Sequence, residues 1–243
     1  MILVVDKDKQ ARLKELVEKS GNTVFFGGAG VSTESGIPDF RSTNGLYNQE
    51  WKHRPETIIS RSFFDKDPEE FFRFYRSRMI FANALPNQAH RKLAELEARG
   101  KLSAVVTQNI DGLHQKAGSK TVYELHGSVL RNFCMDCGTP YGLEAVVDAP
   151  EIIPRCECGG IIKPDVVLYE EPLDEEIMRQ AISAISHAEL LIVAGTSLAV
   201  WPAAGFLDYF KGDAMVLINL SATARDMQAD LLITDPVGEV FSW

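Results

Sequence analysis

The feature that most constrains the fold is a repeated pattern, in which a short apolar strand ends in glycine or a small polar residue and helical segments separate the strands. The predicted strands are rich in β-branched and aliphatic residues, and they span residues 23–26, 103–107, 122–125, 189–194 and 216–220. Nearly continuous apolar strands are typical of a parallel sheet that is buried on both faces, because connecting helices cover it. The sequence therefore predicts an α/β fold with its ligand crevice at the carboxyl ends of the strands.

Two regions depart from this pattern. Residues 46–84 are helical and rich in aromatic side chains, whereas residues 130–167 contain the cysteines, with glycines, prolines and little periodicity. A chain of 243 residues can hold one large domain with a smaller insertion. We therefore predict a large domain made of residues 8–45, 85–129 and 168–243, and a small domain made of the two departing regions.

The four cysteines stand in two close pairs, Cys134 with Cys137 and Cys156 with Cys158. Four thiolates at such spacings suit tetrahedral zinc, and cytoplasmic cysteines favour metal ligation over disulfides. Because four protein ligands leave no open position, the predicted zinc site is structural rather than catalytic. The second pair is one residue shorter than the common C-x2-C spacing, which could alter the geometry of the predicted zinc site.

Net charge and apolar patterning narrow the class of partners. The net charge of −9 disfavours a broad nucleic-acid interface and favours basic peptides over polyanions. The apolar patch at the N-terminus is far too short for a signal peptide, and no apolar run approaches the roughly 18 residues that span a membrane. We predict a soluble, monomeric, cytoplasmic protein without nucleic-acid or membrane partners.

A glycine-rich turn follows the first strand. Gly28-Ala29-Gly30 begins like the dinucleotide fingerprint G-x-G-x-x-G, but Thr33 stands at the third glycine position. The fingerprint also requires an acidic residue about 20 positions later, at the end of a second strand, and no strand is predicted before that position here. The turn is therefore either a nucleotide site or a simple tight turn, and a standard hydride-transferring dehydrogenase is disfavoured. The loop Gly36–Arg41, which belongs to no helix or strand, also needs a reason to be ordered.

Polar side chains follow two other strands. His126 comes directly after residues 122–125, and its imidazole suits a general base because it titrates near neutrality. Gln108, Asn109 and Asp111 follow residues 103–107 and can hydrogen-bond ribose hydroxyls or a carboxamide. The residues alone leave two alternatives open, a buried structural histidine and a turn rich in Asn and Asp.

Taken in order, several segments resemble the sirtuin family of NAD-dependent protein-lysine deacylases, in its bacterial form. They are GAGVSTESGIPDFRS, TQNIDGLH, ELHGS, the paired cysteines, KPDVVLYEE, GTSLAVWPA and INLSAT. The resemblance runs from about residue 10 to the C-terminus, so it covers a single catalytic unit. It implies a Rossmann-like large domain and a small zinc-containing domain, with NAD and an acyl-lysine peptide meeting between them.

The resemblance also implies roles for residues that match its motifs. His126 would be the general base, and Asn109 would hold the nicotinamide ribose and position water. The peptide would pair as a third strand with the backbone around Val167–Tyr169 and with the loop near Ala199–Trp201, a form of β-augmentation. The residues implied in NAD contact are Gly28, Ala29, Gly30, Asp39, Phe40, Arg41, Gln108, Asn109, Ile110, Asp111, Gly195, Thr196, Ser197, Asn219 and Val237.

The implied reaction transfers the acyl group of lysine to ADP-ribose and releases nicotinamide and 2′-O-acyl-ADP-ribose. Two alternatives use the same NAD site, a protein ADP-ribosyltransferase and a non-catalytic module that binds NAD or ADP-ribose. Asn109, Asp111 and His126 argue against the second alternative, since a sensor would not need a base.

A pair of residues on the helix before Pro86 suggests which acyl group the enzyme would remove. Tyr75 and Arg78 lie at i and i+3 and would share a face. In sirtuins that remove succinyl or malonyl groups, a Tyr-x-x-Arg pair reads the acyl carboxylate, for which arginine is a suitable partner. The alternative is that Tyr75 packs in the core and Arg78 is solvated or paired with an acid.

Two further departures from the family pattern concern the loops. Gly27 stands where relatives usually carry threonine, so the cofactor loop would be more mobile. Glu170 replaces a common glycine in the peptide-binding segment, and we expect it to add a negative charge beside the substrate.

Overall fold

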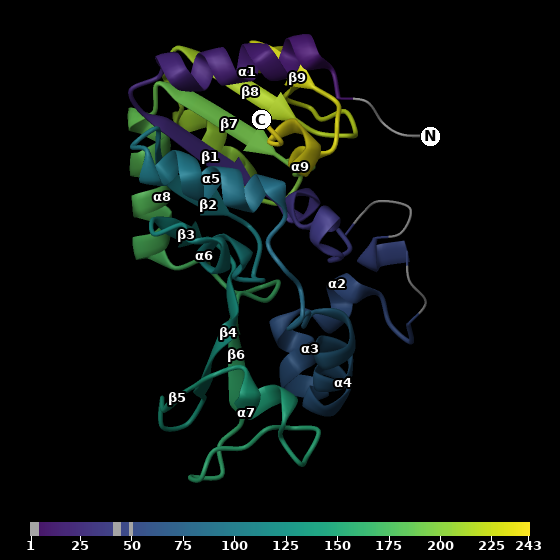
Figure 1. Ribbon diagram of the computed structural model, residues 1–243. Coiled ribbons are helices and arrows are strands. Elements are labelled where there is room, and N and C mark those ends of the chain that lie inside the picture. Colours follow the sequence, from purple (N-terminus) through teal and green to yellow (C-terminus); the bar gives the residue numbers. More distant parts are fainter. Residues whose placement is uncertain (1–4, 41–44, 49–50) are drawn as a thin grey trace.

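A six-stranded parallel sheet forms the centre of the protein (Figure 1). The computed structural model describes residues 5–40, 45–48 and 51–243. The strand order is β3-β2-β1-β7-β8-β9, and every neighbouring pair runs parallel. The strands are β1 (Thr23–Gly27), β2 (Leu102–Thr107), β3 (Val122–Glu124), β7 (Leu190–Ala194), β8 (Ala214–Ile218) and β9 (Leu231–Ile233). The winding direction reverses between β1 and β7, and such a switch point opens a crevice at the carboxyl edge of the sheet.

Helices cover both faces of the sheet, which confirms the predicted fold class. Phe25 packs into a core with the first group of helices, whereas Val24 and Phe26 pack into a separate core with the second group. This alternation follows from the two-residue period of a strand. The first group is α1 (Lys7–Lys19), α5 (Gln88–Ala98) and α9 (Val237–Val240); the second is α8 (Glu175–His187) and the 3-10 segment η4 (Ala203–Tyr209).

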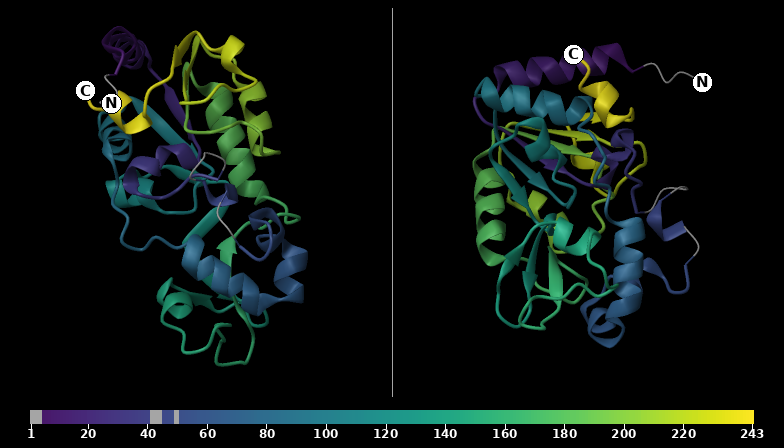
Figure 2. Two further views of the ribbon diagram at one scale, coloured as in Figure 1. Left: turned by 90° about the vertical axis from the view of Figure 1, so that its right-hand side faces the viewer. Right: turned by 60° about the horizontal axis from the view of Figure 1, so that its bottom comes forward.

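A smaller lobe lies below the carboxyl edge of the sheet (Figures 1 and 2). Its antiparallel sheet has the order β5-β4-β6. Helices α3 and α4 lie beside this sheet, and their phenylalanines share one core with Val129, Cys134 and Ile162. The elements of the lobe are β4 (Gly127–Cys134), β5 (Pro140–Tyr141), β6 (Ile162–Val166), α2 (Pro55–Ile58), α3 (Arg61–Lys66), α4 (Pro68–Arg78) and α7 (Glu144–Val147).

The sequence prediction missed the strands of the small sheet, because residues 130–165 show little periodicity, and it missed two short elements of the main domain. Strand β9 and helix α6 (Leu113–Ala117) were not predicted, because each is too short to show a period. Strand β8 ends at Ile218, so Asn219 follows the strand instead of lying within it. No helix among the described residues is long and apolar enough to cross a bilayer.

Candidate functional site

One large cleft opens at the carboxyl edge of the main sheet. Its volume is about 950 Å³, and small-molecule sites typically occupy roughly 300–1,000 Å³. It is lined by His126, by Val167 and Tyr169, and by every described residue of the predicted NAD set: Gly28, Ala29, Gly30, Asp39, Phe40, Gln108, Asn109, Ile110, Asp111, Gly195, Thr196, Ser197, Asn219 and Val237. Arg41, the remaining member of that set, lies outside the described residues. The fold thus gathers residues that follow β1, β2, β3, β7 and β8.

The glycines after β1 allow two loops to approach each other closely. A Cβ atom on Gly28 would lie 2.7 Å from the Cβ of Thr196, and one on Gly30 would lie 2.7 Å from the Cα of Gly195. The N–H groups of Gly28 and Gly30 donate to the carbonyls of Ala194 and Gly195, at 3.0 and 2.8 Å. Glycine is needed here because the loops after β1 and β7 pack backbone against backbone at the switch point.

A buried serine links two of the predicted site residues. The Ser32 hydroxyl donates to Asp111 Oδ2 at 2.6 Å and accepts from Asn109 Nδ2 at 3.0 Å. The other Asp111 oxygen accepts from the Leu113 N–H at 2.9 Å. Burial raises the pKa of Asp111, although these two hydrogen bonds oppose the shift. Sequence reasoning assigned no role to Ser32, and its only signal was its place in the loop that follows Gly30.

The hydrogen bond that His126 makes determines its tautomer. His126 Nδ1 lies 2.9 Å from the carbonyl oxygen of Gln108. A carbonyl can only accept, so we assign the proton to Nδ1, which leaves a lone pair on Nε2. Burial lowers the pKa of His126, and the bond to Gln108 partly opposes that shift. The imidazole is therefore neutral near pH 7 and able to accept a proton at Nε2.

Gln108 ties His126 to the loop after β7. In addition to its carbonyl bond with His126, its side-chain Nε2 donates to Thr196 Oγ1 at 3.0 Å. The carbonyl of Thr196 in turn accepts from Asn219 Nδ2. The ends of β2, β3, β7 and β8 are thus connected by one chain of hydrogen bonds.

The segment after β6 is held between the two lobes. The N–H of Val167 donates to the carbonyl of His126 at 3.0 Å. Tyr169 forms a parallel bridge with Ser60, in which its N–H donates to Ile59 at 3.0 Å and its carbonyl accepts from Arg61 at 2.9 Å. The segment predicted to bind peptide is therefore paired on one side with the residues that precede α3.

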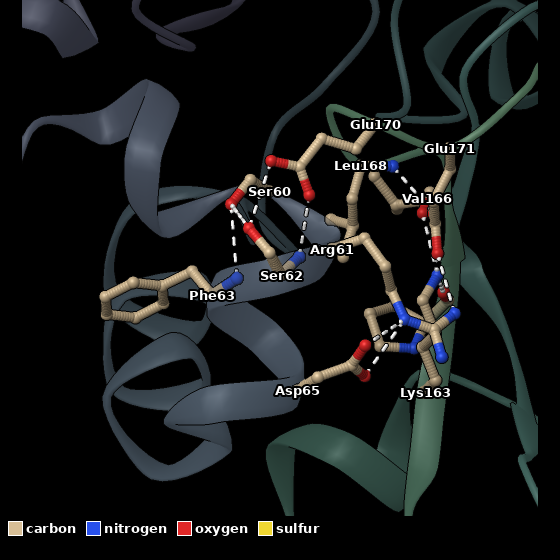
Figure 3. Close-up of polar contacts among 11 residues, drawn as sticks. Ser60, Arg61, Ser62, Phe63, Asp65, Lys163, Val166, Leu168, Glu170 and Glu171 are labelled. Carbon is tan, nitrogen blue, oxygen red and sulfur yellow. Dashed lines mark hydrogen bonds and ion pairs between the residues drawn. The ribbon is translucent and has the colours of Figure 1, made fainter.

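The carboxylate of Glu170 is hydrogen-bonded to a neutral residue, Ser62. Its two oxygens accept from the N–H and the hydroxyl of Ser62, at 2.9 and 3.0 Å (Figure 3). Glu170 is exposed and lines the cleft, and Ser62 is neutral, so the expectation that Glu170 adds a negative charge beside the substrate stays a prediction. The backbone of Glu170 has a φ of 75°, which is rare for a residue with a side chain.

The two residues considered for acyl recognition lie in different environments. Arg78 lines the cleft, and its guanidinium carbon lies 5.5 Å from the centre of the Trp51 ring. Tyr75 is fully buried, does not line the cleft and stacks on Phe71 at 5.6 Å. Within the described residues its hydroxyl has no hydrogen-bond partner. The structure thus separates the members of the predicted pair.

The four cysteines come together in the small lobe, where β4 ends at Cys134. Their sulfur atoms all lie within 4.8 Å of one another, and three of the separations are 3.4, 3.5 and 3.6 Å. Tetrahedral zinc with Zn–S bonds of about 2.3 Å requires sulfurs roughly 3.8 Å apart. Cys134, Cys137, Cys156 and Cys158 therefore fit one zinc ion despite the short spacing of the second pair.

Comparison with known proteins gives consistent matches over nearly the whole chain. The model of the Sir2 family matches residues 28–202. The NAD-dependent protein deacetylase of Clostridium acetobutylicum is 59% identical over 236 residues, which is 96% of each chain. The NAD-dependent protein deacetylase of Cutibacterium acnes is 52% identical, over 95% of each chain.

Solved structures agree with these matches. A Sir2 structure with a p53 peptide and NAD+ has a TM-score of 0.84 at 40% identity, and the match covers 95% of this chain and 94% of that one. Another, Sir2 bound to an acetylated peptide, has a TM-score of 0.85 at 38% identity, and the match covers 96% of this chain and 95% of that one.

Proposed function

The chain belongs to the Sir2 family, and on that premise we propose that it is an NAD-dependent protein-lysine deacetylase. It would transfer the acetyl group of a lysine side chain to ADP-ribose and release nicotinamide. Family membership supports this function together with the extent of the match to deacetylases, which is close to full length.

The observation that carries the proposal is the state of His126. Its Nδ1–H donates to the carbonyl of Gln108, and its Nε2 carries a lone pair. His126 also lines the cleft. A neutral imidazole held by one ring nitrogen is the arrangement that a general base needs. We infer that Nε2 accepts a proton from a ribose hydroxyl, which activates that oxygen to receive the acetyl group.

The Ser32 network supports the binding of the nicotinamide half of NAD. NAD supplies the reactive ribose carbon and the nicotinamide leaving group. Ser32 fixes Asp111 and Asn109 relative to each other before any ligand binds. Polar groups that need no rearrangement stabilise developing charge better than water does. We assign to Asn109 and Asp111 the orientation of the ribose and of the carboxamide.

The cysteine cluster supports a structural zinc ion. Four thiolates fill a tetrahedral site, so no position is left for a substrate. The cluster lies where β4 ends, at Cys134, and none of its four cysteines lines the cleft. Zinc would stabilise the three-stranded sheet that carries the peptide-binding segment, and it would take no part in the chemistry.

The most direct test is to incubate the protein with NAD and an acetyl-lysine peptide and to follow the products by mass spectrometry. We expect nicotinamide and acetyl-ADP-ribose to appear in equal amounts with the deacetylated peptide. A protein ADP-ribosyltransferase would instead add ADP-ribose to protein, and that reaction would persist in His126→Ala. The absence of peptide-dependent nicotinamide release would contradict the proposal.

A second candidate activity is the removal of succinyl or malonyl groups. The observation in its favour is Arg78, whose side chain lies among the cleft residues. A guanidinium there can bind an acyl carboxylate in a bidentate manner. The buried position of Tyr75 gives this activity no support from the second residue of the pair. That the enzyme acts as a cytoplasmic monomer also stays a prediction.

A further inference from the structure

Two adjacent glutamates fasten the segment on which, given the proposed function, the acetyl-lysine peptide docks. The segment consists of residues 166–171 and follows β6. Its backbone is paired with Ile59 and Arg61 through Tyr169. Within the described residues, the N–H and the carbonyl of Glu170 make no hydrogen bond, so this part of the segment is available for pairing with a peptide.

Glu171 gathers three donors from three parts of the structure (Figure 3). Its Oε2 accepts from the N–H of Leu168 at 2.8 Å and from Lys163 Nζ of β6 at 3.2 Å. Its Oε1 accepts from Arg61 Nη1 of α3 at 3.2 Å. One carboxylate therefore joins the docking segment, the small sheet and the helical part of the lobe.

Lys163 is a buried cation whose donors are all used. Only 5% of its side chain is exposed, which is unusual for lysine. In addition to Glu171, its ammonium donates to the carbonyls of Pro164 and Val166, at 3.2 and 3.1 Å. An ammonium has three protons, and here each has an acceptor. Lys163 therefore fixes the end of β6 at the point where the docking segment begins.

Glu170 makes a second, separate attachment. Its carboxylate accepts two hydrogen bonds from Ser62 at the start of α3. Its left-handed backbone, with a φ of 75°, is unfavourable for a residue with a Cβ atom. Such strain persists only where surrounding contacts hold it, and it is often associated with ligand sites. Here two contacts hold it: the Ser62 hydrogen bonds to the side chain, and a hydrogen bond from the Glu171 N–H to the Leu168 carbonyl, at 3.0 Å, which closes a turn in which Glu170 is the third residue.

We propose that Glu170 and Glu171 are positioning residues, which hold the docking segment in its peptide-binding conformation before substrate arrives. Neither carboxylate needs to touch the peptide. Their contribution is to remove the cost of ordering this segment when the peptide pairs with it. Losing either attachment should therefore weaken peptide binding while leaving NAD binding and the acetyl-transfer step unchanged.

The test compares Glu171→Gln, Glu170→Gly and Ser62→Ala with the wild type. The first removes the charge that pairs with Lys163 and Arg61. The second relieves the strained φ but removes the attachment, and the third removes the hydroxyl donor from outside the segment. Glu69→Gln is the matched control, because it removes an exposed charge paired with Arg73 on α4. The readouts are the affinity for a fluorescent acetyl-lysine peptide, measured by anisotropy, and the steady-state constants.

We expect the peptide Kd and KM to rise about five- to tenfold in Glu171→Gln and about two- to fivefold in the other two variants, the effect of losing one hydrogen bond or so. We expect the KM for NAD and kcat at saturating peptide to stay within about twofold. If Glu171→Gln folds poorly, the neutral pair Lys163→Met with Glu171→Gln removes the unpaired buried charge and restores a stable fold for the same assay.

Three outcomes overturn the inference. They are an unchanged peptide affinity in the folded variants, tighter binding in Glu170→Gly, and parallel losses in NAD and peptide binding, which would indicate general destabilisation. A wild-type protein that binds the peptide without turning it over would contradict the proposed function alone. In that case the anisotropy measurements would still test whether Glu170 and Glu171 position the docking segment.

Discussion

At the scale of single residues, the pH dependence of activity should follow His126. Burial is the main cause that lowers its pKa below 6.5. The base is neutral above its folded pKa and protonated below it, so kcat/KM should fall only as the pH decreases through a value below 6.5. The measurement is a pH profile with acetyl-lysine peptide under limiting substrate. An acid limb centred above pH 7 would contradict this assignment.

Replacing His126 tests the same assignment directly. We expect His126→Ala to lose roughly 10²- to 10⁴-fold in kcat, the usual contribution of a general base. NAD affinity, measured by calorimetry, should change little, because the base is needed after NAD has bound. A variant that retains wild-type kcat would exclude His126 as the base.

We expect the acyl preference to depend on Arg78, which lines the cleft, and not on Tyr75, which does not. Arg78→Ala should reduce the rate on succinyl-lysine peptide relative to acetyl-lysine peptide about tenfold, the effect of losing one charge-assisted contact. Arg73→Ala is the control, because Arg73 is an exposed arginine on the same helix whose guanidinium pairs with Glu69. An enzyme that acts on acetyl-lysine alone, with or without Arg78, would contradict the role.

Tyr75→Phe separates packing from acyl recognition at the same helix. The hydroxyl is buried and has no partner among the described residues, and an unsatisfied buried hydroxyl costs about 1–3 kcal/mol. We therefore expect the variant to be as stable as the wild type or more stable, with an unchanged acyl preference. A selective loss of desuccinylation would show that Tyr75 reaches the acyl group.

At the scale of secondary-structure elements, the glycine after His126 decides how closely strands β4 and β6 approach each other within the small sheet. Gly127 has a φ of 73°, and a Cβ atom there would lie 1.9 Å from the carbonyl oxygen of Asp165 on β6. Gly100 is a matched control, since its φ is 70° and nothing lies within 4 Å of the corresponding Cβ position.

Gly127→Ala should therefore be much more destabilising than Gly100→Ala. Both carry the left-handed cost of about 1–2 kcal/mol, but only Gly127→Ala adds a steric clash worth about 1–3 kcal/mol or more. Chemical denaturation of the two variants measures the difference. Equal losses would show that β6 can move away from Gly127 at little cost.

At the scale of the whole molecule, the cysteine cluster that would hold zinc is separate from the cleft, since none of the four cysteines lines it. Removing zinc with a chelator should lower the melting temperature and the peptide affinity together, because structural zinc contributes to folding. Adding zinc back should restore both. An enzyme that keeps its activity and melting temperature after zinc removal would contradict a structural role for the ion.

The sequence alone determined the parts that depend on local pattern. Apolar strands separated by helices predicted the doubly covered parallel sheet, because a strand buried on both faces must be apolar throughout. Two close pairs of cysteines predicted the metal site, since thiolate spacing is readable along the chain. The residues that follow the strands, such as Asn109 and His126, were located because the carboxyl edge of a parallel sheet gathers them.

Only the tertiary structure decided which side chains are buried, which line the cleft and which residues distant in sequence they contact. Ser32 acquired a role only when the loop after β1 met the loop after β2 and its hydroxyl reached Asp111. Tyr75 and Arg78 share a helix, yet only the packing of that helix buries one and places the other at the cleft. Glu170 and Glu171 are neighbours in sequence, but Glu170 is bound by Ser62 of α3, whereas Glu171 is bound by Arg61 of α3 and by Lys163 of β6. Such contacts join residues that are distant in sequence, and no local pattern records them.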